Sequence, residues 1–115
     1  MTGGRTTADD RDGHPRFKLS DQLSHPVRFS LAAALAGTEE SEFAVVRDHL
    51  QVSDSVLSRQ ASQLEAAGLV RIRKGFVGKR PRTWFALTPA GRAAWEQHLG
   101  ALREIANESL PPSDL

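Results

Sequence analysis

The apolar residues of this chain first recur at the spacing of a helix. Val27, Leu31 and Leu35 stand four residues apart, so they fall on a single helical face. Pro26 precedes them and suits the first position of a helix, where its missing N–H is not needed. The pattern therefore predicts a first helix over residues 26–36.

Two further helices follow, joined by a short turn. The second runs from residue 41 or 42 to residue 50 and has one apolar stripe, formed by Phe43, Val46 and Leu50. The third spans residues 53–67, and its apolar stripe consists of Leu57, Ala61 and Leu64. Two helices joined by a turn of only residues 51–53 have the form of a helix-turn-helix.

The outward side of the third helix is polar and has no carboxylate between Ser55 and Gln63. At about 100° per residue, Ser55, Arg59 and Ser62 point away from the apolar stripe, and Ser53 is a natural N-cap. The flanking residues on this side are Val56, Ser58 and Gln63. Such side chains can reach base edges in a DNA major groove without repelling phosphates. The alternative interpretation is a solvated helix face with no partner.

A β-hairpin is predicted next. Residues 69–73 alternate between apolar side chains and arginines, and residues 83–87 place Phe85 and Leu87 on one side. Each segment therefore has the pattern of a strand with one buried face. The intervening residues 74–82 contain two glycines and a proline, which predict a bent tip.

A last helix closes the predicted domain. Thr88 is a suitable N-cap and Pro89 a suitable first residue, and the helix should end near Ser109. Its apolar residues exceed what one small domain usually buries, so we expect it to pack on the first helix or on a partner chain. The predicted fold class is α+β, mostly α.

The predicted organisation is one domain with two short tails. Residues 1–19 lack apolar periodicity and are rich in Thr, Gly, Asp and Arg, which predicts a flexible N-terminal tail. Residues 20–110 form the folded domain, and residues 111–115 form a C-terminal tail. The length of 115 residues fits a single domain of ordinary size.

Charge is unevenly distributed along the chain. The net charge is +1, but residues 66–95 hold seven of the 15 basic residues and none of the 14 acidic ones. Six of these cations belong to the predicted hairpin: Arg71, Arg73, Lys74, Lys79, Arg80 and Arg82. A concentrated positive patch favours a polyanionic partner. The alternative is a hairpin whose charged edges only discourage aggregation.

Several classes of function find no support in the sequence. There is no cysteine, which excludes disulfides and thiolate metal sites. The four histidines match no metal-ligand or catalytic-triad spacing, and no Gly-rich phosphate loop follows a strand. No apolar run approaches the roughly 20 residues of a membrane span. We therefore predict no enzyme activity, no cofactor and no membrane partner.

The chain resembles the winged-helix DNA-binding domains of prokaryotic transcriptional regulators, as a compact single-domain relative of the MarR and ArsR groups. The resemblance covers roughly residues 25–102. It is carried by HPVRFSLAAALAG as the first helix, by the LSRQ…LEAAGLV join of helix to strand, and by the KRPRT…LTPAGR join of wing to helix. The cysteine ligands of metal-sensing ArsR proteins are absent, and the flanking helices are shorter than those of full MarR proteins.

The resemblance implies a winged helix-turn-helix with a two-stranded wing and a C-terminal helix. It implies sequence-specific binding of double-stranded DNA, with the recognition helix at about 53–67 and a basic wing at about 74–82. Recognition-helix roles fall on Ser55, Ser58, Arg59, Ser62 and Gln63, and wing roles on Lys79, Arg80 and Arg82. A DNA-binding protein of this kind is expected in the cytoplasm, associated with the nucleoid.

The resemblance also implies a homodimer, which would bind an inverted repeat. The candidate interface residues are Phe29 on the first helix and Trp95, Leu99 and Leu102 on the last. The alternative for Trp95 and Leu99 is that they close the core of their own chain. The competing function is a winged helix that serves as a protein–protein interaction module, because a fold does not dictate a function.

Overall fold

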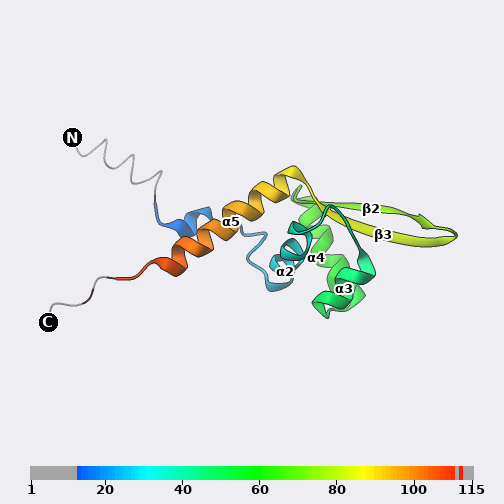
Figure 1. Cartoon of the computed structure of the whole chain (residues 1–115), viewed down its shortest axis with the longest axis horizontal. Coiled ribbons are helices and arrows are strands. Elements are labelled where there is room, and N and C mark those ends of the chain that lie inside the picture. The colour runs from blue at the N-terminus through cyan, green and yellow to red at the C-terminus, as the bar shows by residue number, and fades with distance from the viewer. Residues whose placement is uncertain (1–12, 111, 113–115) are drawn as a thin grey trace.

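The computed structural model describes residues 13–110 and residue 112. Figure 1 shows a cluster of helices from which a long hairpin and a long helix extend. The elements, in chain order, are η1 (Pro15–Lys18), α2 (Pro26–Ala36), β1 (Ser41–Glu42), α3 (Phe43–Leu50), α4 (Asp54–Ala66), β2 (Val70–Val77), β3 (Arg80–Leu87) and α5 (Pro89–Asn107). The predicted class, a mostly helical α+β fold, is confirmed.

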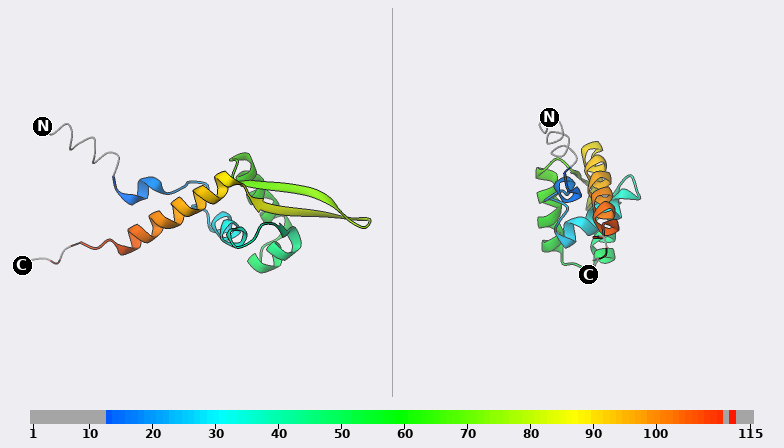
Figure 2. Two further views of the ribbon diagram at one scale, coloured as in Figure 1. Left: turned by 45° about the horizontal axis from the view of Figure 1, so that its top comes forward. Right: turned by 90° about the vertical axis from the view of Figure 1, so that its left-hand side faces the viewer.

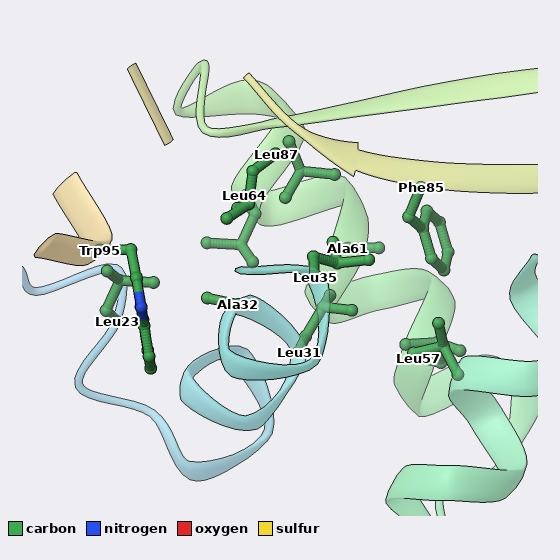
Figure 3. Close-up of a cluster of buried hydrophobic side chains, with 12 residues drawn as sticks. Leu23, Leu31, Ala32, Leu35, Leu57, Ala61, Leu64, Phe85, Leu87 and Trp95 are labelled. Atoms are coloured by element: carbon green, nitrogen blue, oxygen red, sulfur yellow. The ribbon is translucent and has the colours of Figure 1, made fainter. Parts of the chain in front are cut away.

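The core lies where α2 and α4 meet the base of the sheet (Figure 3). The predicted inner face of α4 is fully buried, as are Leu31 and Leu35 of α2. Burial of each leucine side chain contributes about 1.5–3 kcal/mol. Ala61 stands between two leucines on α4, and its small side chain lets α2 approach closely.

The sheet has three strands rather than the two that the sequence predicts. Their order is β1-β3-β2, and all pairs are antiparallel. The short strand β1 pairs Ser41 with Phe85 and Glu42 with Trp84. The expectation that the second helix begins at residue 41 or 42 is therefore wrong, because these two residues are extended and α3 begins at Phe43.

The hairpin has longer strands and a tighter tip than expected. Strands β2 and β3 pair continuously until Val77 meets Arg80, so only Gly78 and Lys79 form the turn. Gly78 has a φ of 63°, as suits the first position of a two-residue hairpin turn. The expected bent tip over residues 74–82 is wrong, because Pro81 continues β3 at a stretch that β1 does not cover.

Residues 13–19, which the sequence places in a flexible tail, lie along α5 in the structure. His14 accepts a hydrogen bond from the backbone of Arg16 and so caps η1, and its Nε2 lies 2.7 Å from a carboxylate oxygen of Glu108. Gln97 of α5 contacts the carbonyl of Lys18. The part of the predicted tail formed by residues 1–12 lies outside the described residues.

His98 anchors the chain just after η1. It is 2% exposed, and its Nδ1 accepts a hydrogen bond of 2.9 Å from the backbone N–H of Ser20. Burial lowers the pKa of His98, which favours the neutral ring that can accept this bond. In the sequence this histidine is one of four that match no metal-ligand or catalytic-triad spacing.

Helix α5 begins in close contact with the junction between α4 and β2. Thr88 Oγ1 accepts the N–H of Gly91 at 2.9 Å and donates to the carbonyl of Gly68 at 2.7 Å. A Cβ on Gly91 would lie 1.9 Å from the carbonyl oxygen of Leu69. From this junction α5 runs away from the core in the direction opposite to the hairpin (Figure 2, left).

We predict that Gly91→Ala destabilises the protein, whereas Gly100→Ala in the same helix stabilises it. Overpacking against a backbone carbonyl costs about 1–3 kcal/mol or more. A Cβ at Gly100 meets no atom within 4 Å, and alanine is favoured over glycine inside a helix by about 1 kcal/mol. Urea denaturation of both variants measures the two changes. Equal stabilities would contradict the close approach.

Candidate nucleic-acid interface

The polar side of α4 is exposed, as the sequence predicts. Ser53 caps the helix by accepting the N–H of Val56 at 3.2 Å, and its hydroxyl lies 3.2 Å from that of Ser55. The remaining predicted residues on this side are also exposed: Ser58, Arg59, Ser62 and Gln63. Because Leu57, Ala61 and Leu64 are buried on one side of α4, these side chains all face solvent on the other.

The register of the hairpin divides its side chains between two faces. The helix-side face consists of Val70, Ile72, Lys74 and Phe76 on β2 with Leu87, Phe85, Thr83 and Pro81 on β3. The outer face consists of Arg71, Arg73, Gly75 and Val77 with Ala86, Trp84, Arg82 and Arg80. The helix-side face is buried at its base and becomes exposed towards the turn.

A cleft of about 450 Å³ separates α4 from the helix-side face. From α4 it is lined by Ser58, Ser62 and Glu65, and from the hairpin by Lys74 and Thr83. Hydroxyl groups and an ammonium group can all donate hydrogen bonds to phosphate oxygens. The cleft therefore joins the exposed side of α4 to the hairpin through donors that suit a nucleic-acid backbone, with the carboxylate of Glu65 as the one lining group among these that would repel a phosphate.

Three of the four arginines of the outer face, all except Arg80, are engaged by carboxylates. Arg73 forms a bidentate pair with Glu40, with N–O distances of 2.9 and 2.8 Å, and Arg71 lies 3.8 Å from the same carboxylate. Arg82 Nε lies 3.1 Å from Glu42. The positive charge of residues 66–95, which include no acidic residue, is therefore partly neutralised by Glu40 and Glu42 from an earlier part of the chain.

Arg73 is held on its other side by an aromatic ring. Its guanidinium lies 4.0 Å from the ring centroid of Trp84, and a Cβ on Gly75 would come within 3.2 Å of the same ring. The hydrogen bond from Arg73 is the main cause that holds the pKa of Glu40 below its ordinary value. Arg73 of β2 thus contacts both β3, through Trp84, and Glu40, the residue just before β1.

The other three predicted hairpin cations are available to a partner. Lys74, Lys79 and Arg80 are exposed, and among the residues that the structure describes no carboxylate lies within 4.0 Å of them. Lys74 lies on the helix-side face, Lys79 in the turn and Arg80 just after it. Unlike Arg73 and Arg82, these three cations form no ion pair with a described residue.

The residues predicted for a dimer interface differ in their exposure. Trp95 is 8% exposed and belongs to the core of its own chain, where its ring centroid lies 5.1 Å from that of Phe29. Leu99 is partly buried against the same core, and Leu102 is half-buried. Trp95 therefore has little surface left for a partner, because α5 packs on α2 at this point.

The part of the chain that the structure describes shows neither a metal site nor a membrane-spanning helix. No group of three or more histidines and carboxylates placed to hold a metal ion occurs there. None of the described helices is both long and apolar enough to cross a membrane.

A helix-turn-helix followed by an antiparallel hairpin beside its second helix defines a winged helix. The profile of the family described as "Winged helix DNA-binding domain" matches residues 27–106. The chain belongs to this family. The resemblance noted in the sequence is thereby confirmed.

Solved structures add the functional class. The chain is similar to a transcriptional regulator homologue from Pyrococcus horikoshii OT3, with 26% identity over 76% of this chain and 87% of that chain, and a TM-score of 0.72. It is similar to a MarR-family transcriptional regulator from Silicibacter pomeroyi, with 28% identity over 87% of this chain and 63% of that chain, and a TM-score of 0.57.

A third structure, at 22% identity, shows a likeness of fold. It is a transcriptional regulator from M. tuberculosis in complex with DNA, and the match covers 90% of this chain and 71% of that chain with a TM-score of 0.61. Together, these comparisons make the chain a compact winged-helix regulator related to the MarR family rather than an enzyme.

We predict that Arg73→Ala raises the pKa of Glu40 towards its ordinary value of 4.5. Arg71→Ala is the matched control and should raise it less, because Arg71 is the weakest of the causes that lower it. A pH titration of the Glu40 carboxyl by NMR measures both.

The same pair contributes to stability in a defined pH range. The pKa of Glu40 is lower in the folded state, so its stabilisation is complete above the unfolded-state value and is lost as pH falls through the folded-state value. Arg73→Ala should remove this part of the pH dependence of unfolding. An unchanged titration of Glu40 in Arg73→Ala would contradict the pairing.

Proposed function

We propose that this protein is a sequence-specific DNA-binding transcriptional regulator that inserts α4 into the major groove. The observation that carries the proposal is the exposed side of α4, which presents hydroxyl, amide and guanidinium groups beside a hairpin in which three cations form no ion pair with any residue that the structure describes. The related regulator from M. tuberculosis was solved with DNA. We place the protein on the chromosome, in the cytoplasm.

The residues of α4 divide between base edges and phosphates. Arg59 is the long donor at the centre of the exposed side, and it can pair with O6 and N7 of guanine. The shorter donors Ser55, Ser58, Ser62 and Gln63 reach base edges or the flanking backbone, and Val56 can contact a thymine methyl group. Ser53, at the N-terminus of the helix, lies where a phosphate binds favourably.

The hairpin acts as the wing, and its cations have different roles. Lys74, Lys79 and Arg80 contact phosphates or the minor groove, supported by their exposure and the lack of nearby carboxylates among the described residues. Arg73 and Arg82 position the wing instead, supported by their pairs with Glu40 and Glu42. This second assignment departs from the direct DNA contacts that the sequence suggests for both arginines.

The regulator acts as a homodimer on an inverted repeat. One winged helix reads only a few base pairs, which is too little to select one site in a genome. Two copies related by a two-fold axis would read two half-sites about one helical turn apart. The outer half of α5, which extends away from the core and carries half-buried Leu99 and Leu102, supplies an interface.

Selection of bound sequences from random duplex DNA tests the DNA-binding function. We expect an enriched inverted repeat whose binding constant falls with salt, with a slope of about −0.9 per neutralised phosphate. Arg59→Ala should relax the preference at one base position in each half-site, a loss of about 1–3 kcal/mol in discrimination.

Arg103→Ala is the matched control, because it removes the same charge from an exposed position on α5. It should leave the selected sequence unchanged. Selection without any enriched sequence would favour a protein-interaction module instead. A uniform loss of affinity in Arg59→Ala would assign this residue to the phosphate backbone.

Sedimentation at micromolar concentration tests the dimer. We expect Leu102→Glu to give a folded monomer that binds a single half-site weakly, because the new charge would be buried between the two copies. Ala93→Glu adds the same charge at an exposed position nearer the start of α5 and should remain a dimer. A monomeric wild-type protein, with or without DNA, would disprove the dimer.

A further inference from the structure

The tip of the hairpin, residues 76–81, carries apolar side chains that the cationic character of the wing does not explain. Phe76 is 71% exposed and Val77 is 55% exposed. Phe76 pairs across the hairpin with Pro81, which is also exposed. These side chains bury little in their own chain, so they do not hold the fold together. A phenylalanine exposed to this extent at a projecting turn points to an interaction.

The immediate surroundings of Phe76 define the chemistry of that partner. Lys74 lies two residues before it on the same face, and Lys79 and Arg80 follow in the turn and just beyond. The partner must therefore offer negative charges that flank a narrow apolar slot. The DNA minor groove has this form, since two rows of phosphates border the stacked bases.

The position of Phe76 on the hairpin favours DNA over an anionic membrane surface. Phe76 and Pro81 lie on the helix-side face, which lower down forms the cleft beside Ser58 and Ser62 of α4. The tip therefore continues the surface that the proposed DNA-binding function already uses. Binding to a membrane surface would not require Phe76 and Pro81 to lie on the same face of the hairpin as the cleft beside α4.

The hairpin is long enough to reach a neighbouring groove. Ile72 packs on the core, and Val77, at the end of β2, lies five residues further along the strand. At about 3.3 Å per residue these residues span roughly 17 Å, more than the roughly 12 Å width of the major groove. Figure 1 shows the two strands projecting past the helices. A wing beside α4 thus crosses one phosphate strand and places its tip at the minor groove.

We propose that Phe76 enters the minor groove as an apolar wedge that partly unstacks one base step and bends the DNA. The inference rests on the proposed DNA-binding function and adds a contact of a different kind from the phosphate contacts of Lys79 and Arg80. Phenylalanine wedges in the minor groove typically open a base step and bend the duplex towards the major groove. Flexible pyrimidine–purine steps such as TA and CA are the expected targets, because they deform at least cost.

The test compares Phe76→Ala, Phe76→Leu and Lys79→Ala on the duplex that the wild-type protein selects. Affinity is measured at several salt concentrations, and bending by energy transfer between dyes at the two ends of the duplex. Phe76→Ala should lose at least about fivefold in affinity, with a smaller bend and an unchanged salt slope. Lys79→Ala should keep the bend and reduce the slope by about 0.9. Phe76→Leu should restore part of the bend.

Each contrary outcome identifies a different failure. Wild-type affinity and bend in Phe76→Ala, with the fold intact by circular dichroism, would overturn the wedge and leave the DNA-binding function standing. Absence of any DNA binding by the wild-type protein would overturn the proposed function itself. Binding to vesicles of phosphatidylserine and phosphatidylcholine that is lost in Phe76→Ala, with DNA binding unaffected, would replace the wedge with a membrane contact.

Discussion

The burial of one stripe of α4 is the constraint on which the rest of the structure depends. Leu57, Ala61 and Leu64 are inaccessible to solvent, and a helix that buries positions seven residues apart has no freedom to rotate about its axis. The side chains on its opposite side are therefore presented together. The packing of the core thus determines which residues of α4 face outward. The same helix therefore contributes to the stability of the fold and presents the candidate interface.

The hairpin is packed into the core at its base, through side chains such as Val70 and Phe85, and polar contacts on its outer face hold it as well. The exposed pair of Arg73 with Glu40 adds little free energy by itself, as is usual for surface ion pairs. Its bidentate geometry and the Trp84 ring beneath the guanidinium instead restrict the direction of the hairpin, because one side chain on β2 contacts both β3 and Glu40, the residue just before β1. The positive charge of Arg73 serves this positioning, whereas Lys74, Lys79 and Arg80 lie nearer the turn.

The helices were predictable from the sequence because each has a local signal. Pro26 opens α2 and a periodic apolar stripe continues it, and the predicted bounds agree with the structure. Strand β1 was not predictable, since two residues show no periodicity and their pairing partner Phe85 lies over 40 residues away. The carboxylate of Glu40 was missed for this reason, and with it the role of Arg73. The DNA contacts themselves remain predictions, because they depend on a partner.

The continuity of α5 links the two ends of the molecule mechanically. The helix runs without a break for 19 residues from Pro89 to Asn107, or roughly 28 Å at 1.5 Å per residue. Its first turn is held against the start of β2 by Thr88 and Gly91. A rod of this length that moves by roughly 3 Å at its outer end tilts by about 6° at its origin. A partner that binds the outer end of α5 would therefore act on the same helix that is fixed at the start of the hairpin.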